Sequence, residues 1–129
     1  MEENVNGVTN ELGVIKVTDE VVAIIAGIAA SEVPGVACMS GGFAEGIAEA
    51  FGRKTMSKGV KVEVGEKEAA IDLYVIIEYG ARIPEVAWNI QEKVKEAVET
   101  MTGLSVVEVN IHIQGIEFEK NIKHVQSSE

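Results

Sequence analysis

The sequence predicts a single α+β domain in which two long helices cover the apolar side of a mixed, mainly antiparallel sheet of short strands. Several segments alternate apolar and polar residues, which is the period of a strand with one buried face. Two longer segments carry helix-start and helix-stop signals around apolar stretches. With one short helix between them, the order is β-α-β-(α)-β-β-α-β, and 129 residues is the length of one domain.

The first strand and the first long helix follow each other directly. Residues 13–17 read GVIKV and predict a strand. Thr18 is a suitable N-cap for a helix over 18–32, because its hydroxyl accepts a backbone hydrogen bond and two acidic residues occupy the first turn. The helix should end before Pro34. Its body, VVAIIAGIAA, is apolar on every side, which predicts burial on more than one face, within the domain or against another subunit.

A short strand and a short helix are predicted next. Residues 35–39 form the strand, and Cys38 within it is expected to be a small buried hydrophobe. After a glycine-rich break at 40–42, residues 43–51 carry one apolar stripe at i, i+4 and i+8. The stripe consists of Phe43, Ile47 and Phe51. Packing on the domain's own core is favoured, and the alternative is a peripheral membrane helix.

Two strands then form a hairpin around a turn at 65–68. In 60–64 the valines share one face. In the second strand the inward side chains are predicted to be Ile71, Leu73, Val75 and Ile77, and the outward ones Asp72, Tyr74, Ile76 and Glu78.

The second long helix spans 84–102, with Pro84 at its first position and Gly103 ending it. Its apolar stripe extends to Met101. In the last strand, one face is predicted to carry Val107, Val109, Ile111 and Ile113, and the other Glu108, Asn110, His112 and Gln114.

The polar face of the sheet is the preferred interaction surface. Five residues of this face are the predicted partner contacts: Tyr74, Ile76, Asn110, His112 and Gln114. Tyr74 and Ile76 are apolar enough to anchor a partner. An antiparallel sheet can also simply face water, so both readings stay open. Together with the apolar first helix, this face makes a homo-oligomer plausible.

A basic cluster is the second candidate. It consists of Arg53, Lys54, Lys58 and Lys61, and residues 50–62 contain no acidic side chain. Such a cluster can contact an acidic partner, a lipid head group or another anion. The alternative, a solvated loop that balances neighbouring acids, is favoured because most surface charge runs are of that kind.

Composition excludes several classes of function. With 11 basic and 21 acidic residues the net charge is −10, which argues against nucleic-acid binding. The longest apolar run, 21–30, is shorter than the ~20 residues of a membrane span. The N-terminus has no basic region like that of a signal peptide. We therefore expect a cytoplasmic domain over 12–119 with flexible tails at 1–11 and 120–129.

Catalytic, metal and cofactor sites are not predicted. His112 lies on a polar strand face and His124 in the predicted tail, and with one cysteine they make no convincing metal site. No serine stands in a G-x-S-x-G turn. The carboxylates are many and single out no acid–base pair. We expect a protein that is not an enzyme and needs no cofactor.

Three stretches in this order resemble the alkaline shock protein family. They are GVIKVTDEVVAIIAGIAASEVPGV, GIAEAFGRKTMSKGVKVEVGE and VVEVNIHIQGI, and the resemblance covers about residues 11–119. The family consists of small proteins of Gram-positive bacteria that are often called envelope stress response proteins. It has no agreed catalytic residues to carry over.

The resemblance implies a cytoplasmic, non-enzymatic protein of cell-envelope homeostasis that acts by protein–protein contacts, as a structural or scaffolding component. Its members are associated with the membrane through partners, so recruitment to the inner face of the membrane is implied. The alternative is a regulatory or ligand-binding module linked to fatty-acid and lipid metabolism, because some relatives are close to those pathways.

Overall fold

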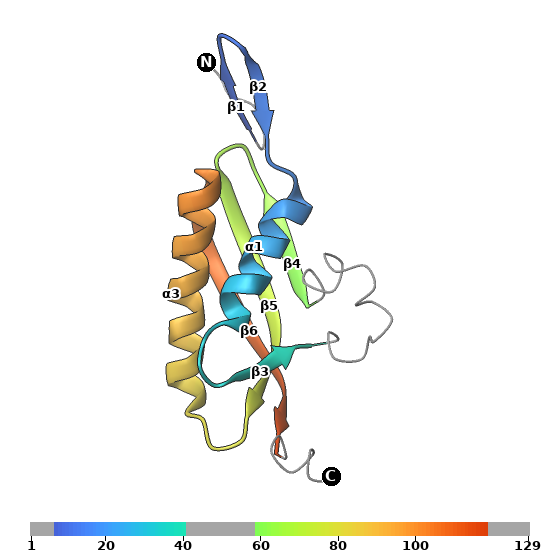
Figure 1. The fold of residues 1–129 in the computed structure, drawn as a ribbon, viewed down its shortest axis with the longest axis vertical. Helices are drawn as coiled ribbons and strands as arrows, with labels where there is room; N and C mark the ends of the chain where they lie inside the picture. Colours follow the sequence, from blue (N-terminus) through green and yellow to red (C-terminus); the bar gives the residue numbers. More distant parts are fainter. Residues whose placement is uncertain (1–6, 41–58, 119–129) are drawn as a thin grey trace.

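The computed structural model describes residues 7–40 and 59–118, and these form an α+β fold (Figure 1). Helices α1 (Asp19–Ser31) and α3 (Ile83–Thr102) lie on the same side of a four-stranded sheet. The strands of this sheet are β3 (Val36–Met39), β4 (Val60–Val64), β5 (Glu68–Glu78) and β6 (Ser105–Glu117). The predicted fold class is confirmed, and so is the predicted order of the two long helices and of the strands from residue 13 onward.

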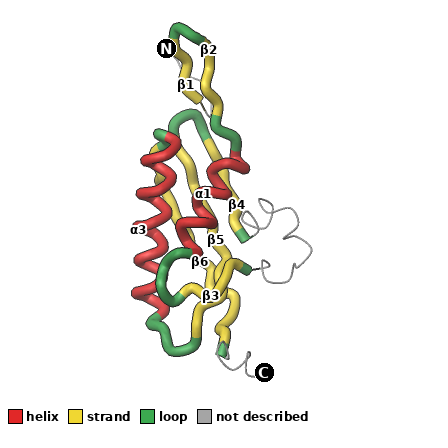
Figure 2. The backbone as a smooth tube through the Cα atoms, in the orientation of Figure 1, coloured by secondary structure: helices red, strands yellow, loops and turns green. Residues whose placement is uncertain are grey.

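Strand β5 is the centre of the sheet. β6 runs parallel to it along its whole length, from the pair Glu68–Ser105 to the pair Glu78–Glu117. On its other side β4 pairs antiparallel with the first half of β5, and β3 pairs antiparallel with the second half. β3 and β4 therefore lie end to end along one edge of β5 (Figure 2).

The junction of β3 and β4 lies opposite Tyr74. The Ser40 N–H donates to the Tyr74 carbonyl at 2.7 Å, and the Tyr74 N–H donates to the Gly59 carbonyl at 2.8 Å. Gly59 has φ +81°, and a Cβ there would lie 2.9 Å from the carbonyl oxygen of Ser40. The edge is thus one strand interrupted at Tyr74. The predicted short helix at 43–51 lies outside the described residues.

The core lies between the sheet and the helices. The inward side chains of β5 predicted from alternation are each fully buried: Ile71, Leu73, Val75 and Ile77. Both helices contribute fully buried residues to the same cluster, among them Val22 and Ala26 of α1 and Ile90, Val94 and Val98 of α3.

Local sequence signals fix the ends of both helices as predicted. The Val21 N–H donates to the Thr18 hydroxyl at 3.3 Å, so Thr18 is the N-cap of α1. Pro84 lies in the first turn of α3, where a missing N–H costs nothing. Gly103 ends α3 with φ 83°, the left-handed conformation that a side chain would disfavour.

Three side-chain placements differ from the prediction. Val107 is 56% exposed rather than inward, because a bulge between the pairs Ala69–Val106 and Ala70–Glu108 shifts the alternation and Val106 is buried instead. Met101 is 70% exposed at the end of α3. Cys38 is half-buried.

The N-terminal strands form a hairpin of their own. Residues 7–10, expected within the tail, form strand β1 (Gly7–Asn10), which pairs antiparallel with β2 (Gly13–Lys16). The predicted strand at 13–17 therefore belongs to a separate two-stranded sheet that extends beyond the end of the main sheet (Figure 1). Every residue of β2 is exposed.

Candidate interaction surface on the sheet

The side of the sheet opposite the helices carries the predicted interaction surface. Side chains of β4, β5 and β6 that point away from the core form what we call the outer face: Lys61, Asp72, Tyr74, Ile76, Asn110, His112 and Gln114. Because α1 and α3 both pack on the other side, no described helix covers it (Figure 2). The structure brings the five predicted partner residues to this one face and adds Lys61 from the basic cluster.

An aromatic stack lies at the centre of the outer face. Tyr74 and His112 are paired in the parallel register of β5 and β6, and their ring centroids are 4.4 Å apart with an interplanar angle of 11°. The Lys61 ammonium lies 5.8 Å from the centroid of the Tyr74 ring, within the range of a cation–π contact. Three strands therefore contribute to one platform, formed by Lys61, Tyr74 and His112.

The carboxylate of Asp72 contacts the imidazole of this stack. The His112 Nε2 lies 3.1 Å from Asp72 Oδ1, and both side chains are more than a third exposed. This hydrogen bond, helped by one from Asn110 and by the charge of Lys61, lowers the pKa of Asp72 against the opposing effect of burial. Asp72 therefore stays ionised at neutral pH, and the imidazole donates its Nε2–H to it.

The β3 end of the outer face was not predicted. The Ser40 hydroxyl donates to Gln114 Oε1 at 3.1 Å, and this contact links the interrupted edge to β6. Cys38 pairs with Ile76 in the register of β3 and β5. The sequence marked Ser40 only as the start of a break. Ser40 comes close to Gln114 because β3 pairs antiparallel with β5, and the sequence pattern of neighbouring residues does not reveal which strands pair.

The polar side chains of the outer face contact one another. Asp72 is hydrogen-bonded to His112, and Ser40 is hydrogen-bonded to Gln114. The Ser40 hydroxyl donates to the side-chain amide oxygen of Gln114. Within residues 7–40 and 59–118, no three His, Cys, Asp or Glu side chains are grouped so that they could hold a metal ion.

Of the predicted basic cluster, the structure describes only Lys61. Arg53, Lys54 and Lys58 lie outside the described residues, so a binding role for the basic cluster stays a prediction. None of the described helices is long and apolar enough to cross a membrane.

Comparison with known proteins identifies relatives over most of the chain. Residues 7–118 match the model of the alkaline shock protein 23 family, which is described as having a cell envelope-related function. The protein YqhY of Bacillus subtilis is 46% identical over 118 residues, covering 92% of this chain and 87% of YqhY. YloU of the same organism is 39% identical over 106 residues, covering 81% of this chain and 88% of YloU.

A named stress protein is among the relatives. The stress response regulator gls24 homolog of Streptococcus pyogenes serotype M3 is 34% identical over 105 residues, covering 81% of this chain and 59% of the relative. Among solved structures, a MamM CTD is 16% identical with a TM-score of 0.46, covering 74% of this chain and 95% of that one. On the family match and the identity to YqhY, the chain belongs to the alkaline shock protein family, with its cell envelope-related function.

Proposed function

We propose that this protein is a non-enzymatic component of the cell-envelope stress response that acts by binding another protein through its outer face. The family match and a relative named as a stress response regulator support the process. The single observation that carries the binding role is the Lys61–Tyr74–His112 platform, which three strands hold on a side that no described helix covers.

The kind of contact follows from the platform. Tyr74 and His112 offer flat aromatic area, and aromatic residues are enriched at the centres of protein interfaces. Asp72 and Lys61 place opposite charges beside that area, which favours one orientation of a polar partner. The proposed site of action is the cytoplasm, at the inner face of the membrane, where an envelope-associated partner holds the protein.

The test is an affinity pull-down of tagged protein from gently solubilised native cells, read by mass spectrometry. Wild type is compared with Tyr74→Ala and with Trp88→Ala as the matched control, because Trp88 is 58% exposed on α3, away from the outer face. Circular dichroism checks that each variant is folded. We expect near-stoichiometric recovery of an envelope or membrane protein with wild type and Trp88→Ala, and its loss with Tyr74→Ala.

Two outcomes contradict the proposal. Recovery that is equal for wild type and Tyr74→Ala removes the outer face from the interaction. Recovery of enzymes of lipid synthesis in place of envelope proteins replaces the proposed function with the alternative, a regulatory module of fatty-acid and lipid metabolism.

A further inference from the structure

Helix α1 exposes an apolar stripe that a solvated helix would fill with polar residues. Val21 and Ile28 are 43% and 41% exposed, and Ile24 between them is half-buried. These positions are spaced i, i+3 and i+7, so they share one side of the helix. The opposite side of α1 is already buried against the sheet and α3. As predicted, α1 is buried against more than one neighbour, the sheet and α3, and the apolar stripe is the side that stays exposed.

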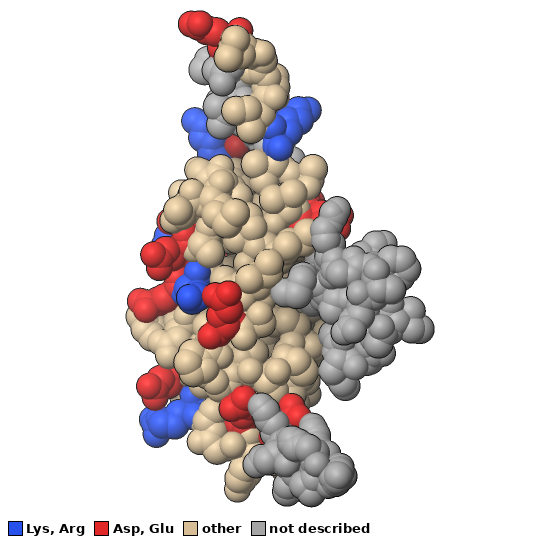
Figure 3. Space-filling view, in the orientation of Figure 1, with Lys and Arg blue, Asp and Glu red and all other residues tan. Residues whose placement is uncertain are grey.

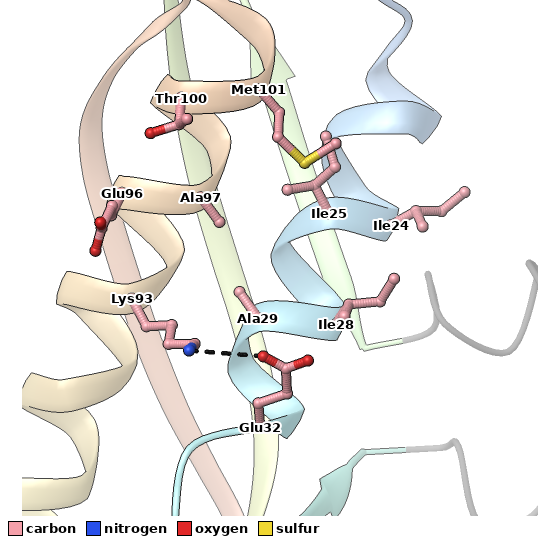
Figure 4. Close-up of a pocket in the computed structure, with 10 residues that line it drawn as sticks. All are labelled: Ile24, Ile25, Ile28, Ala29, Glu32, Lys93, Glu96, Ala97, Thr100 and Met101. Atoms are coloured by element: carbon pink, nitrogen blue, oxygen red, sulfur yellow. Dashed lines mark ion pairs between the residues drawn. The ribbon is translucent and has the colours of Figure 1, made fainter.

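The stripe continues into a groove between α1 and α3. The groove has a volume of about 510 Å³ and is lined mainly by apolar side chains, with Ala29 of α1 and Ala97 of α3 pointing toward each other (Figure 4). Met101, which is 70% exposed, reaches from the end of α3 toward α1 (Figure 4). Small residues on the floor and larger ones at the sides make this a groove and not a flat surface.

An ion pair marks the other end of the groove. Lys93 Nζ lies 3.6 Å from Glu32 Oε1 across the two helices. The distance from Lys93 to Met101 along α3 is eight residues, or about 12 Å at ~1.5 Å per residue. That length accepts about two turns of another helix, laid with its apolar side into the groove.

The charges around the groove indicate the chemistry of the occupant. Because Lys93 is paired with Glu32, the charge left over along the described lining of the groove is that of Glu96. Figure 3 shows acidic side chains along the side of α3 and little charge over α1. A segment that enters the groove therefore gains by carrying lysine or arginine beside its apolar stripe.

The same charges argue against a second copy of this chain. α1 contains no lysine or arginine, and it has acidic residues at its first turn and at its C-cap, Glu32. Two parallel copies of α1 packed side by side bring these acidic first turns together. Two antiparallel copies bring each first turn beside Glu32, whose charge is already paired with Lys93. Like charges placed close together across an interface oppose binding.

We propose that the groove between α1 and α3 binds an amphipathic helix of a partner protein, with an apolar stripe at i, i+3 or i+4, and i+7, flanked by lysine or arginine. This surface lies on the helix side of the molecule, so it is separate from the outer face. A protein with both surfaces holds two partners at once and joins them.

The probe is a fluorescein-labelled peptide of leucine and lysine, about 16 residues or roughly four helical turns long, with its leucines in one stripe. A peptide of the same composition with its leucines spread around the helix measures attraction by charge alone. Fluorescence anisotropy gives the Kd of each for the full chain. We expect saturable binding of the striped peptide and at least tenfold weaker binding of the scrambled one.

The variants locate the binding site. Ile28→Gln combined with Met101→Gln leaves the net charge unchanged and should weaken binding of the striped peptide at least tenfold. Val107→Gln is the matched control, because Val107 is 56% exposed on β6, and it should bind as wild type does. Tyr74→Ala should also bind normally, which separates this proposal from the function proposed for the outer face. Thermal melts confirm that all variants are folded.

Several results overturn the proposal. They are equal binding of the two peptides, an unchanged Kd in the groove variant, or a homodimer in sedimentation equilibrium that the groove variant dissociates. A photo-crosslinker placed at residue 28 that links to another part of the same chain also overturns it, because the groove is then occupied from within.

Discussion

The carboxylate of Asp72 on the outer face makes the stability of the fold depend on pH. Its pKa is lowered from an ordinary value of 3.8, chiefly by the hydrogen bond from His112. A carboxyl group whose pKa is lower in the folded state stabilises the fold above its unfolded pKa, and that contribution is lost as the pH falls through the folded pKa. Because the pair is solvent-exposed, the contribution should stay below about 1 kcal/mol.

We expect Asp72→Asn to be less stable than wild type at pH 7 and to approach wild type as the pH falls below 3.8. Urea unfolding at several pH values measures the difference. Glu66→Gln is the control, since this exposed carboxylate lies in the turn between β4 and β5. A difference between Asp72→Asn and wild type that stays constant down to acid pH would contradict the assigned role of the carboxylate.

Gly59 supports a second prediction about a single residue. Its φ of +81° costs a side chain about 1–2 kcal/mol. A Cβ would also lie 2.9 Å from the Ser40 carbonyl oxygen. Because that oxygen belongs to the backbone, the clash can be relieved only if the junction of β3 and β4 shifts. Crowding of this kind typically adds about 1–3 kcal/mol. Gly59→Ala should therefore lower the free energy of unfolding by more than the left-handed backbone alone explains.

The matched control is Gly103→Ala, because Gly103 has φ +83° but nothing lies within 4 Å of the position that an added Cβ would take. Urea unfolding of both variants separates conformational strain from crowding. Equal losses for the two variants would show that the junction opposite Tyr74 adapts to a methyl group at no cost.

Residue-level prediction from sequence succeeded where the cause is local. Thr18, Pro84 and Gly103 have their predicted roles because capping and φ preferences depend on a few neighbouring residues. The stack of Tyr74 on His112 depends on the parallel register of β5 and β6, and alternation alone shows only that each residue points outward.

At the scale of elements, strand β5 was predicted most completely, because its alternation runs without interruption and one face is buried. β6 was predicted as an element but its phase was wrong at Val107. A bulge adds one residue to one strand, and only the pairing partner reveals it. Met101 was assigned to the apolar stripe of α3 from helical periodicity alone, which does not tell how completely a neighbouring element covers each position of the stripe.

The burial of β5 yields a prediction for this element. Leu73 is fully buried at the centre of the core, and truncating it to alanine should cost about 2–5 kcal/mol. Leu12→Ala is the control, because Leu12 is 97% exposed and surface changes usually stay within about 0.5 kcal/mol. Urea denaturation of both variants gives the comparison. Similar small losses for both would mean that β5 is not the central element of the core.

At the scale of the whole molecule, the core between the sheet and the helices separates the two proposed binding surfaces. The outer face and the groove between α1 and α3 lie on opposite sides of the sheet, with the buried residues of β5 between them. This separation lets each surface be altered without the other. Sequence analysis could propose the polar face from alternation, but the groove exists only through the packing of two helices that are distant in the chain.

The β1–β2 hairpin raises the question of whether it unfolds together with the rest of the domain or on its own. Every residue of β2 is exposed, and the extensive contacts of the two strands are with each other. An isolated two-stranded hairpin is marginally stable at best, so it should open without the rest of the domain. Deleting residues 1–16 should change the free energy of unfolding of the body by no more than about 0.5 kcal/mol.

Deleting residues 1–18 is the sharper comparison, because it also removes the Thr18 cap and the half-buried Val17, which packs against the core. That deletion should cost about 1 kcal/mol or more. Urea unfolding compares both deletions with the full chain, and hydrogen exchange should show fast exchange for amides 7–16. Slow exchange there, or a large loss from the shorter deletion, would mean that the hairpin folds as part of the body. The cooperative domain would then begin before α1.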